Sequence, residues 1–316
     1  MAIAAAGQVE PTVTMSPYGS PHRAPDGSAA RARGAVRDVL RHWGMLTARW
    51  RVEPDYLIVG AKRGGTTSLA RWLVDHPDVL PLFPARETRK GIYYFAPNYE
   101  RGARWYRSHF PTRTAVAAQA RRRGRPVAVG EASPYYLHHP HAPIRARRLA
   151  PAARIIILLR DPIERAHSHW TERTRAGVET LPFADALAAE PTRLGDAEER
   201  LAADPSFVHF GHQHYGYAAQ SHYADAVARW LAAYPSDQVL VVRSEDLYDT
   251  PRKVYQHVLD HLGLPHHDLP EFAAHNRRGR PAIPDDGRYR LAGTFDDDIA
   301  ALESLLGRSM DWGDDR

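Results

Sequence analysis

The 316-residue sequence predicts a single-domain α/β fold in which helices flank a parallel sheet. Two short apolar runs, 55–60 and 154–160, have the composition of strands that are buried on both faces. A helix-start signal follows each run, and such strand–helix alternation is typical of parallel sheets covered by helices. Ligands of these folds bind at the carboxyl ends of the strands, so we expect a site where the two runs end.

The boundaries of the predicted elements have local chemical reasons. Asp161 and Pro162 are the residues preferred at the N-cap and at the first position of a helix. Pro251 and Gly263 bound another helical pattern in the same way. The predicted elements are strands 55–60, 127–130, 154–160 and 238–243, and helices 66–75, 142–149, 162–175, 217–234 and 251–262.

Composition limits the partners and the chemistry. The formal charge of +5 and the isoelectric point near 9.4 favour an anionic partner. We interpret the arginine run 121–125 as a solvated loop and predict no nucleic-acid partner. The absence of cysteine excludes disulfides, thiolate metal sites and cysteine nucleophiles. No apolar run is long enough for a transmembrane helix and the first residues lack a secretory pattern, so we expect a cytoplasmic protein.

A glycine-rich turn joins the first predicted strand to its helix. Gly60 and Gly65 take the two glycine positions of the nucleotide-binding motif G-x-x-x-x-G-K-[ST]. Thr66 stands where that motif has the lysine that reaches the β- and γ-phosphates, while Lys62 and Arg63 lie earlier in the turn. This P-loop-like pattern therefore predicts an anion cradle at a helix N-terminus, for a nucleotide without a γ-phosphate.

A second polar pair lies downstream. Arg160 ends the strand 154–160, and Ser168 lies about two turns into the helix that follows. Both side chains are therefore expected to face one ligand.

These two segments together resemble the 3′-phosphoadenylyl-sulfate-dependent sulfotransferases, in particular the heparan sulfate and carbohydrate branch and its bacterial relatives. Three further segments are similar to the family in the same order, and the likeness runs from about residue 54 to 312. These segments are 131–135 after the strand 127–130, the triplet Arg278, Gly279 and Arg280, and the ending 306–312.

The resemblance implies a donor site for 3′-phosphoadenylyl sulfate, with adenosine 3′,5′-bisphosphate as the product. The first loop would bind the 5′-phosphosulfate end, and Arg160 with Ser168 would bind the 3′-phosphate. The late loop would close over the 3′-phosphate. The implied donor-binding residues are Arg63, Gly64, Gly65, Thr66, Thr67, Arg160, Ser168, Arg278, Gly279 and Arg280.

The chain departs from the family pattern at the residues that would take part in the transfer reaction. Arg63 stands in the place of the family's loop lysine, with Lys62 beside it, and we expect both to stabilise charge on the bridging oxygen. Gly91 occupies the position of the family's catalytic glutamate. Glu87 is the first candidate base because it lies in the segment before 93–95, and Glu131 and His138 follow.

We therefore predict sulfuryl transfer to a hydroxyl or amine of a small-molecule or glycan acceptor, for instance a carbohydrate or natural product. The alternatives are a P-loop small-molecule kinase that uses ATP, and a non-catalytic module that binds the nucleotide or a glycan. No metal is expected, because His209, His212 and His214 are loosely spaced and lack a carboxylate partner.

The predicted organisation has a disordered tail at 1–30, a basic amphipathic helix at 31–53 and a sulfotransferase domain at 54–316. Residues 176–215 are polar and contain proline, and we interpret them as a candidate lid or acceptor-binding insert. The apolar residues of the helix lie within 33–50, and we expect the helix to pack on the domain, with contact to a membrane surface or a partner as the alternative. These apolar residues are Val36, Val39, Leu40, Trp43 and Trp50.

Overall fold

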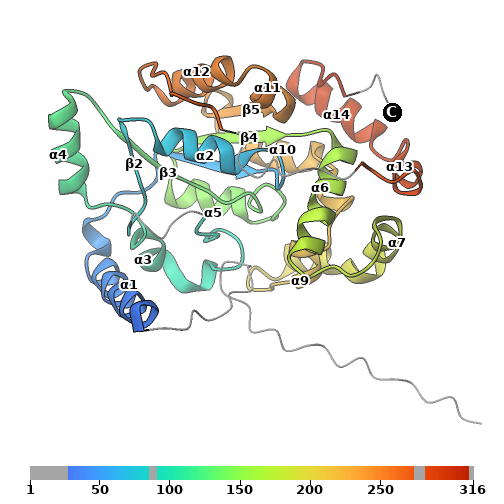
Figure 1. Cartoon of the computed structure of the whole chain (residues 1–316), viewed down its shortest axis with the longest axis horizontal. Helices are drawn as coiled ribbons and strands as arrows, with labels where there is room; N and C mark the ends of the chain where they lie inside the picture. Colours follow the sequence, from blue (N-terminus) through green and yellow to red (C-terminus); the bar gives the residue numbers. More distant parts are fainter. Residues whose placement is uncertain (1–27, 85–90, 274–281, 313–316) are drawn as a thin grey trace, which may run out of the picture.

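A five-stranded parallel sheet forms the centre of the molecule in the computed structural model, which describes residues 28–84, 91–273 and 282–312. The strand order is β2-β3-β1-β4-β5, with helices on both faces (Figure 1). Their bounds are β1 Tyr56–Gly60, β2 Val79–Leu80, β3 Ala128–Ala132, β4 Arg154–Leu159 and β5 Val239–Arg243. The predicted α/β fold with a parallel sheet is confirmed.

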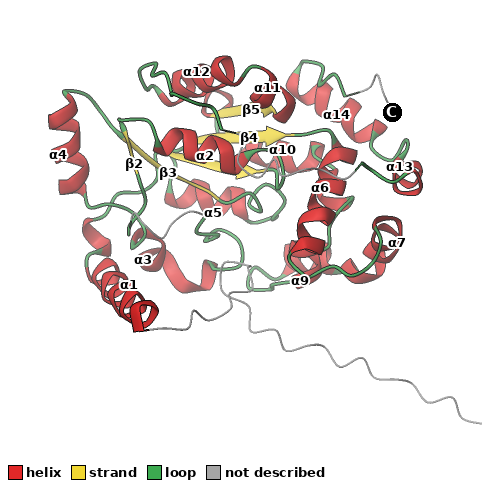
Figure 2. Ribbon diagram, in the orientation of Figure 1, coloured by secondary structure: helices red, strands yellow, loops and turns green. Residues whose placement is uncertain are grey.

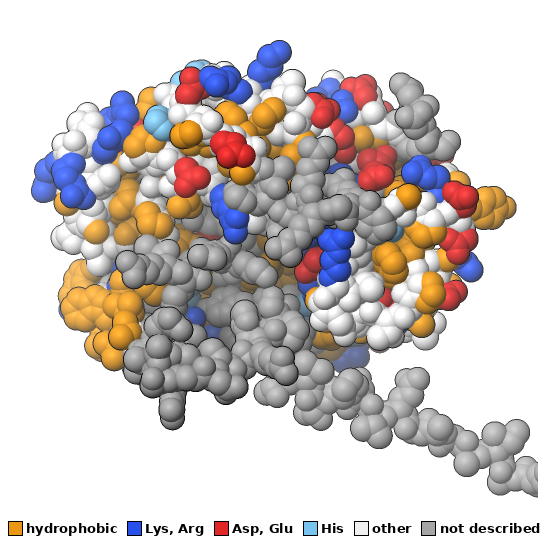
Figure 3. All heavy atoms as spheres, viewed as in Figure 1, with side chains coloured by type: hydrophobic (Ala, Val, Ile, Leu, Met, Phe, Trp, Pro, Cys, Tyr) orange, Lys and Arg blue, Asp and Glu red, His pale blue; other side chains and the backbone are white. Residues whose placement is uncertain are grey.

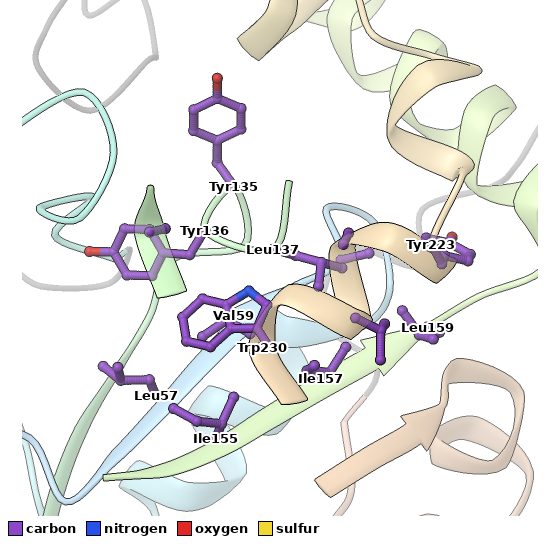
Figure 4. Packing of buried hydrophobic residues seen from close by; sticks show 14 of the residues in the cluster. Leu57, Val59, Tyr135, Tyr136, Leu137, Ile155, Ile157, Leu159, Tyr223 and Trp230 are labelled. Atoms are coloured by element: carbon purple, nitrogen blue, oxygen red, sulfur yellow. The ribbon is translucent and has the colours of Figure 1, made fainter. Parts of the chain in front are cut away.

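Alternate residues of the central strands pack into two separate cores. Leu57 and Val59 of β1 face one core, while Tyr56 and Ile58 face the other. Figure 4 shows the first core, where Trp230 packs over the side chains of β1 and β4. Since both faces of β1 and β4 are covered, an almost unbroken apolar sequence is what these strands require.

The helices that follow the strands begin and end close to the predicted residues. Three of them match the predicted bounds: α5 Ala142–Leu149, α6 Pro162–Arg175 and α12 Pro251–Leu262. The Asp161 carboxylate caps α6 by accepting a 3.0 Å hydrogen bond from Glu164 N. Figure 2 shows how helices outnumber strands in the described residues. The remaining α-helices are α1 Ser28–Leu46, α2 Thr66–Val74, α3 Gly102–Arg107, α4 Arg113–Arg123, α7 Phe183–Leu194, α8 Ala197–Ala203, α9 Phe210–His214, α10 Ala224–Ala233, α11 Ser244–Asp249, α13 Asp285–Leu291 and α14 Asp296–Leu306.

Two predictions about local structure are wrong. The helix predicted over 217–234 begins at Ala224, because the Asp298 carboxylate of α14 accepts hydrogen bonds from Tyr223 N and Ala224 N at 2.6 and 3.2 Å. The segment 176–215, expected to be irregular, contains the helices α7, α8 and α9. Pro191 lies inside α7, so proline content alone was a misleading sign of a loop.

The arginine run 121–125 is not simply solvated. It ends α4, and Arg123 and Arg125 each place Nε 2.6 Å from a carboxylate oxygen of Asp78, which is fully buried. Among the described helices, none has the length and apolar character that a membrane-spanning segment requires.

Candidate active site

The loop between β1 and α2 is folded tightly against the end of β4. Ala61 N donates a 2.6 Å hydrogen bond to Leu158 O, and Gly64 N donates to Ala61 O at 3.0 Å. A side chain at position 64 would place its Cβ 2.5 Å from Leu158 O, so only glycine fits there. Gly65 caps α2 with φ at +96°, a conformation that glycine adopts without steric cost.

The start of α2, directly after this loop, is a candidate anion site. The first N–H groups of any helix lack an intrahelical acceptor, and α2 begins at Thr66. Because the helix dipole adds partial positive charge at the same end, the loop and the first turn of α2 suit a phosphate or sulfate group. Thr66 is buried and Thr67 is half-buried, so both lie at the inner side of this turn.

Arg63 joins the loop to α6. Its Nε lies 3.1 Å from Ser168 Oγ, and its backbone has a φ of +71°, which is uncommon outside glycine. The two segments that the sequence assigned to one ligand therefore meet in space, 105 residues apart in the chain.

Arg160 lies directly after β4 with its side chain almost fully buried, 3% exposed. Its guanidinium forms an ion pair with Glu164 one turn later. Within the described residues Nη1 of Arg160 is buried without a hydrogen-bond partner. A buried cationic donor left unpaired is costly, so an anionic ligand at this point would satisfy it.

Lys62 is half-buried beside the insert. Its ammonium group donates to Gln213 O of α9 and lies 4.9 Å from the centre of the Tyr135 ring. Burial and the nearby positive charge of Arg173 lower the pKa of Lys62 well below its usual range.

Three consecutive residues of α9 contact this region. His212 Nδ1 shares a 2.7 Å hydrogen bond with the Tyr135 hydroxyl, Gln213 O accepts from Lys62, and His214 Nδ1 accepts from Arg173 Nη1 at 2.8 Å. The insert 176–215 is therefore in direct contact with the lysine of the donor loop.

Glu172 is a candidate site residue that the sequence prediction did not include. It lies one turn after Ser168 on α6 and accepts a 2.7 Å hydrogen bond from Arg173 Nε. Burial alone would raise the pKa of Glu172, but the bond to Arg173 and the charges of Arg173, Arg63 and Lys62 together lower it. Glu172 is thus an ionised carboxylate beside the cations of the loop. Its i+4 spacing from Ser168 was the available sequence signal.

Glu131 is buried at the end of β3 with four hydrogen bonds. Its two carboxylate oxygens accept from Ile92 N, the Ser133 hydroxyl, and the hydroxyls of Tyr106 and Tyr136, at 2.6–3.0 Å. Burial raises the pKa of Glu131, while these four donors oppose the rise. The carboxylate is occupied in holding the segment after residue 90 against the end of β3.

His138 follows β3 and is also buried, with Nε2 lacking a hydrogen-bond partner among the described residues. Burial and the nearby Arg165 lower the pKa of His138 well below its usual range, so the ring is neutral at pH 7. The other predicted site residues, Glu87, Arg278, Gly279 and Arg280, lie outside the described residues.

Gly91, which takes the glutamate position of the resembled family, is packed against the end of β3. A Cβ there would lie 2.0 Å from Ala132 O and 2.1 Å from Ser133 Oγ. Two residues later, Tyr93 N donates to Ser133 Oγ at 2.9 Å. No side chain fits at position 91 without a backbone shift.

The histidines of the insert each have a local partner. His209 caps α9 by accepting from His212 N at 3.0 Å, while His212 and His214 bind Tyr135 and Arg173 as described above. In the residues that the structure describes, no three His, Asp or Glu side chains form a group that could hold a metal ion.

Comparison with known proteins adds independent observations. A family model described as the sulfotransferase domain matches residues 53–276. The membrane-associated sulfotransferase kil1 of Dictyostelium discoideum is 25% identical, over 82% of this chain and 66% of its own length. The human bifunctional heparan sulfate N-deacetylase/N-sulfotransferase 3 is 30% identical, over 80% of this chain but only 30% of its own length.

The chain thus spans just under two thirds of the first relative and under a third of the second. A solved structure, the sulfotransferase from Alicyclobacillus acidocaldarius, superposes with a TM-score of 0.61 at 29% identity. That match covers 83% of this chain and 99% of the other.

Proposed function

This chain belongs to the sulfotransferase family, and on that premise we propose that it moves a sulfuryl group from 3′-phosphoadenylyl sulfate to a hydroxyl or amine of an acceptor. The observation that carries this proposal is the contact between Arg63 and Ser168. It joins a helix N-terminus suited to one phosphate with a helix face suited to another, as a donor phosphorylated at two positions requires.

The donor would be held mainly by the loop and the start of α2. In this proposal the amide groups of Gly65, Thr66 and Thr67 bind the 5′-phosphosulfate end, where the dipole of α2 favours negative charge, while Gly64 N is bonded to Ala61 O and holds the loop in shape. Arg160 and Ser168 bind the 3′-phosphate, and the unpaired Nη1 of Arg160 supports this assignment. Arg278, Gly279 and Arg280 complete the 3′ contact in this proposal.

The transfer step needs charge stabilisation and a base. The acceptor oxygen or nitrogen attacks the sulfur, the bond from sulfur to the bridging oxygen breaks, and its electron pair stays on that oxygen of the bisphosphate. Arg63 and Lys62 stabilise the negative charge that grows there. Lys62 regains its full charge when an anion replaces Gln213 O as its partner.

We assign the base role to Glu172, which takes the proton from the acceptor. Its lowered pKa keeps it ionised, and its electrostatic interactions with Arg63 and Lys62 support a base role near these two cations. Glu131, with four hydrogen bonds, would position the segment around Ile92 and Tyr93 instead. His138 remains a second candidate because its neutral ring has a free Nε2, and Glu87 stays a candidate from the sequence alone.

The acceptor is proposed to be a small molecule or a glycan. The name of the human relative specifies N-sulfation of heparan sulfate, which supports a glycan amine or hydroxyl as one class. The contact of α9 with Lys62 and Arg173 supports the view that the insert 176–215 forms part of the acceptor side.

A thermal-shift experiment with the full chain tests the donor assignment. Adenosine 3′,5′-bisphosphate is expected to raise the melting temperature, while ATP with Mg²⁺ is expected to have no comparable effect. The reverse result would favour the kinase alternative. The Asp161 carboxylate, a candidate magnesium ligand in that alternative, already caps α6.

A second assay tests catalysis. Incubation with donor carrying labelled sulfate and an extract of small molecules and glycans should yield a labelled product. Stabilisation by the bisphosphate without any transfer would support the non-catalytic module and contradict the enzyme.

A further inference from the structure

A row of large apolar side chains is exposed along α1 and the short helical turn after it. Val36, Val39, Trp43 and Leu46 belong to α1, and Trp50 ends the 3₁₀ turn Ala48–Trp50. Their exposed fractions are 60, 68, 55, 65 and 50%, respectively. We call these five residues the α1 apolar row. Figure 3 shows hydrophobic side chains gathered at the lower left, where Figure 1 places α1.

The row is exposed because the opposite side of α1, near its C-terminal end, is the side that packs against the domain. A Cβ at Gly44 would lie 2.8 Å from Ser108 O, so this residue meets the backbone after α3. Arg51 is buried, donates to Thr47 Oγ1 at 2.8 Å and to Phe110 O, and fixes the helix end to the domain. The end of α1 therefore packs on the domain as expected, but it does so through its other side, and Val36, Val39, Trp43 and Trp50 stay exposed. Leu40 is half-buried.

The surroundings of the row are positively charged. The sequence of α1 contains four arginines and one acid, Asp38. Arg49 stacks on the Trp50 ring at 4.0 Å, and the exposed Arg104 of α3 donates to Met45 O. An occupant of this face must therefore combine apolar character with negative charge.

We propose that the α1 apolar row docks on an anionic lipid surface, with α1 lying in the headgroup region. A basic helix with tryptophan and aliphatic side chains along one side is the type that binds in the plane of a membrane interface. Tryptophan is favoured at that depth, and each arginine near an anionic leaflet adds attraction. The row repeats at the spacing of a coiled-coil seam, but a second copy would bring arginines against arginines.

Co-sedimentation of the full chain with vesicles tests this proposal. Binding is expected to vesicles that contain phosphatidylglycerol and to be much weaker with phosphatidylcholine alone. The double variant Trp43→Ser, Leu46→Ser should bind at least about tenfold more weakly, because it removes buried apolar area. The double variant Arg41→Gln, Arg49→Gln should lose about tenfold as well, and raised salt should reduce native binding.

The matched control is Tyr289→Ser with Leu305→Ser, which removes two exposed apolar side chains from α13 and α14. It should bind the vesicles like the native chain, and all variants should keep the native melting temperature because the changed residues are exposed. Native protein that stays in the supernatant with both vesicle types overturns the proposal, as does equal binding by the Trp43→Ser, Leu46→Ser variant. Sedimentation velocity that shows a dimer broken by that variant would overturn it in favour of a second copy. Sulfate transfer to a water-soluble acceptor should be unchanged in every variant, so this test does not depend on the proposed donor site.

Discussion

The two sides of the candidate site are built differently. The proposed donor side lies at the ends of two neighbouring strands, β1 and β4. It combines the main-chain N–H groups at the start of α2 with the side chains of Arg63, Arg160 and Ser168. The opposite side, around Lys62, consists of side chains and one carbonyl that arrive from Tyr135, α6 and α9. An anion held by backbone geometry constrains few residue types beyond glycine, whereas a side-chain cluster changes with every substitution. The proposed donor side therefore depends on glycine, arginine and serine positions that the sequence identified, whereas the side around Lys62 depends on contacts that it did not.

The largest expected effect comes from the catalytic side. Glu172→Gln should lower kcat about 10²- to 10⁴-fold, since it removes the proposed base, and should leave the affinity for adenosine 3′,5′-bisphosphate unchanged. Because the pKa of Glu172 is lowered, native kcat should persist as pH falls until that lowered pKa is reached, and then decline. Steady-state rates and calorimetry measure the two quantities. Glu198→Gln on α8 is the matched control, and a variant Glu172→Gln with native kcat would return the base role to His138 or Glu87.

An intermediate effect is expected on the donor side. Gly64→Ala would place a methyl group 2.5 Å from Leu158 O, at a backbone atom that cannot move aside. We expect a loss of about 1–3 kcal/mol in unfolding free energy, typical of overpacking, and a loss of bisphosphate affinity of at least about tenfold. Denaturant unfolding and calorimetry measure both.

The control for that variant is Gly124→Ala, at a helix end with φ of +66° and open space around it. It carries backbone strain without a steric clash, and should cost about 1 kcal/mol while leaving nucleotide binding intact. If both variants bind the bisphosphate equally well, the loop is not the phosphate site.

The smallest expected effect is proton uptake by Lys62, which lies in the donor loop and contacts α9. The pKa of Lys62 is lowered in the folded chain, and an anionic ligand should raise it again. The protein should therefore take up as much as about one proton when the bisphosphate binds. Calorimetry in buffers of different ionisation enthalpy measures this uptake, and Lys62→Met should abolish it.

The same shift predicts how stability depends on pH. The unfolded chain binds the Lys62 proton more tightly than the folded chain, so native stability should rise as pH increases from the lowered pKa toward 10.5. Lys62→Met should remove this part of the slope, while Lys253→Met on α12 should keep it. Identical slopes in the native chain and Lys62→Met would show that Lys62 keeps an ordinary pKa.

Sequence predicts the parts of this fold whose causes are local. The start of α6 depends on Asp161 and Pro162, which are neighbours, and the prediction is confirmed to the residue. The start of α10 depends on Asp298, which is 75 residues from Tyr223, and the prediction failed there. The helical sequence pattern extends back to residue 217, and nothing in it indicates that Asp298 near the end of the chain would cap the helix at Tyr223.

The same distinction applies to the site. The sequence identified the loop and α6 as partners because glycines, cations and a strand–helix signal lie together, and Arg63 and Ser168 do meet. It gave no sign of the contact between Lys62 and Gln213, which are 151 residues apart and meet through a backbone carbonyl. Any residue type supplies such a carbonyl, so no residue pattern records it.

The close packing of Gly91 restricts how this enzyme family member can change. A glutamate placed at position 91 would bring its Cβ within 2.0 Å of Ala132 O, so one substitution alone cannot introduce a carboxylate there. Engineering that aims to place a glutamate at this position has to remodel the Ala132–Ser133 corner together with position 91, whereas changes at Glu172 leave that corner intact.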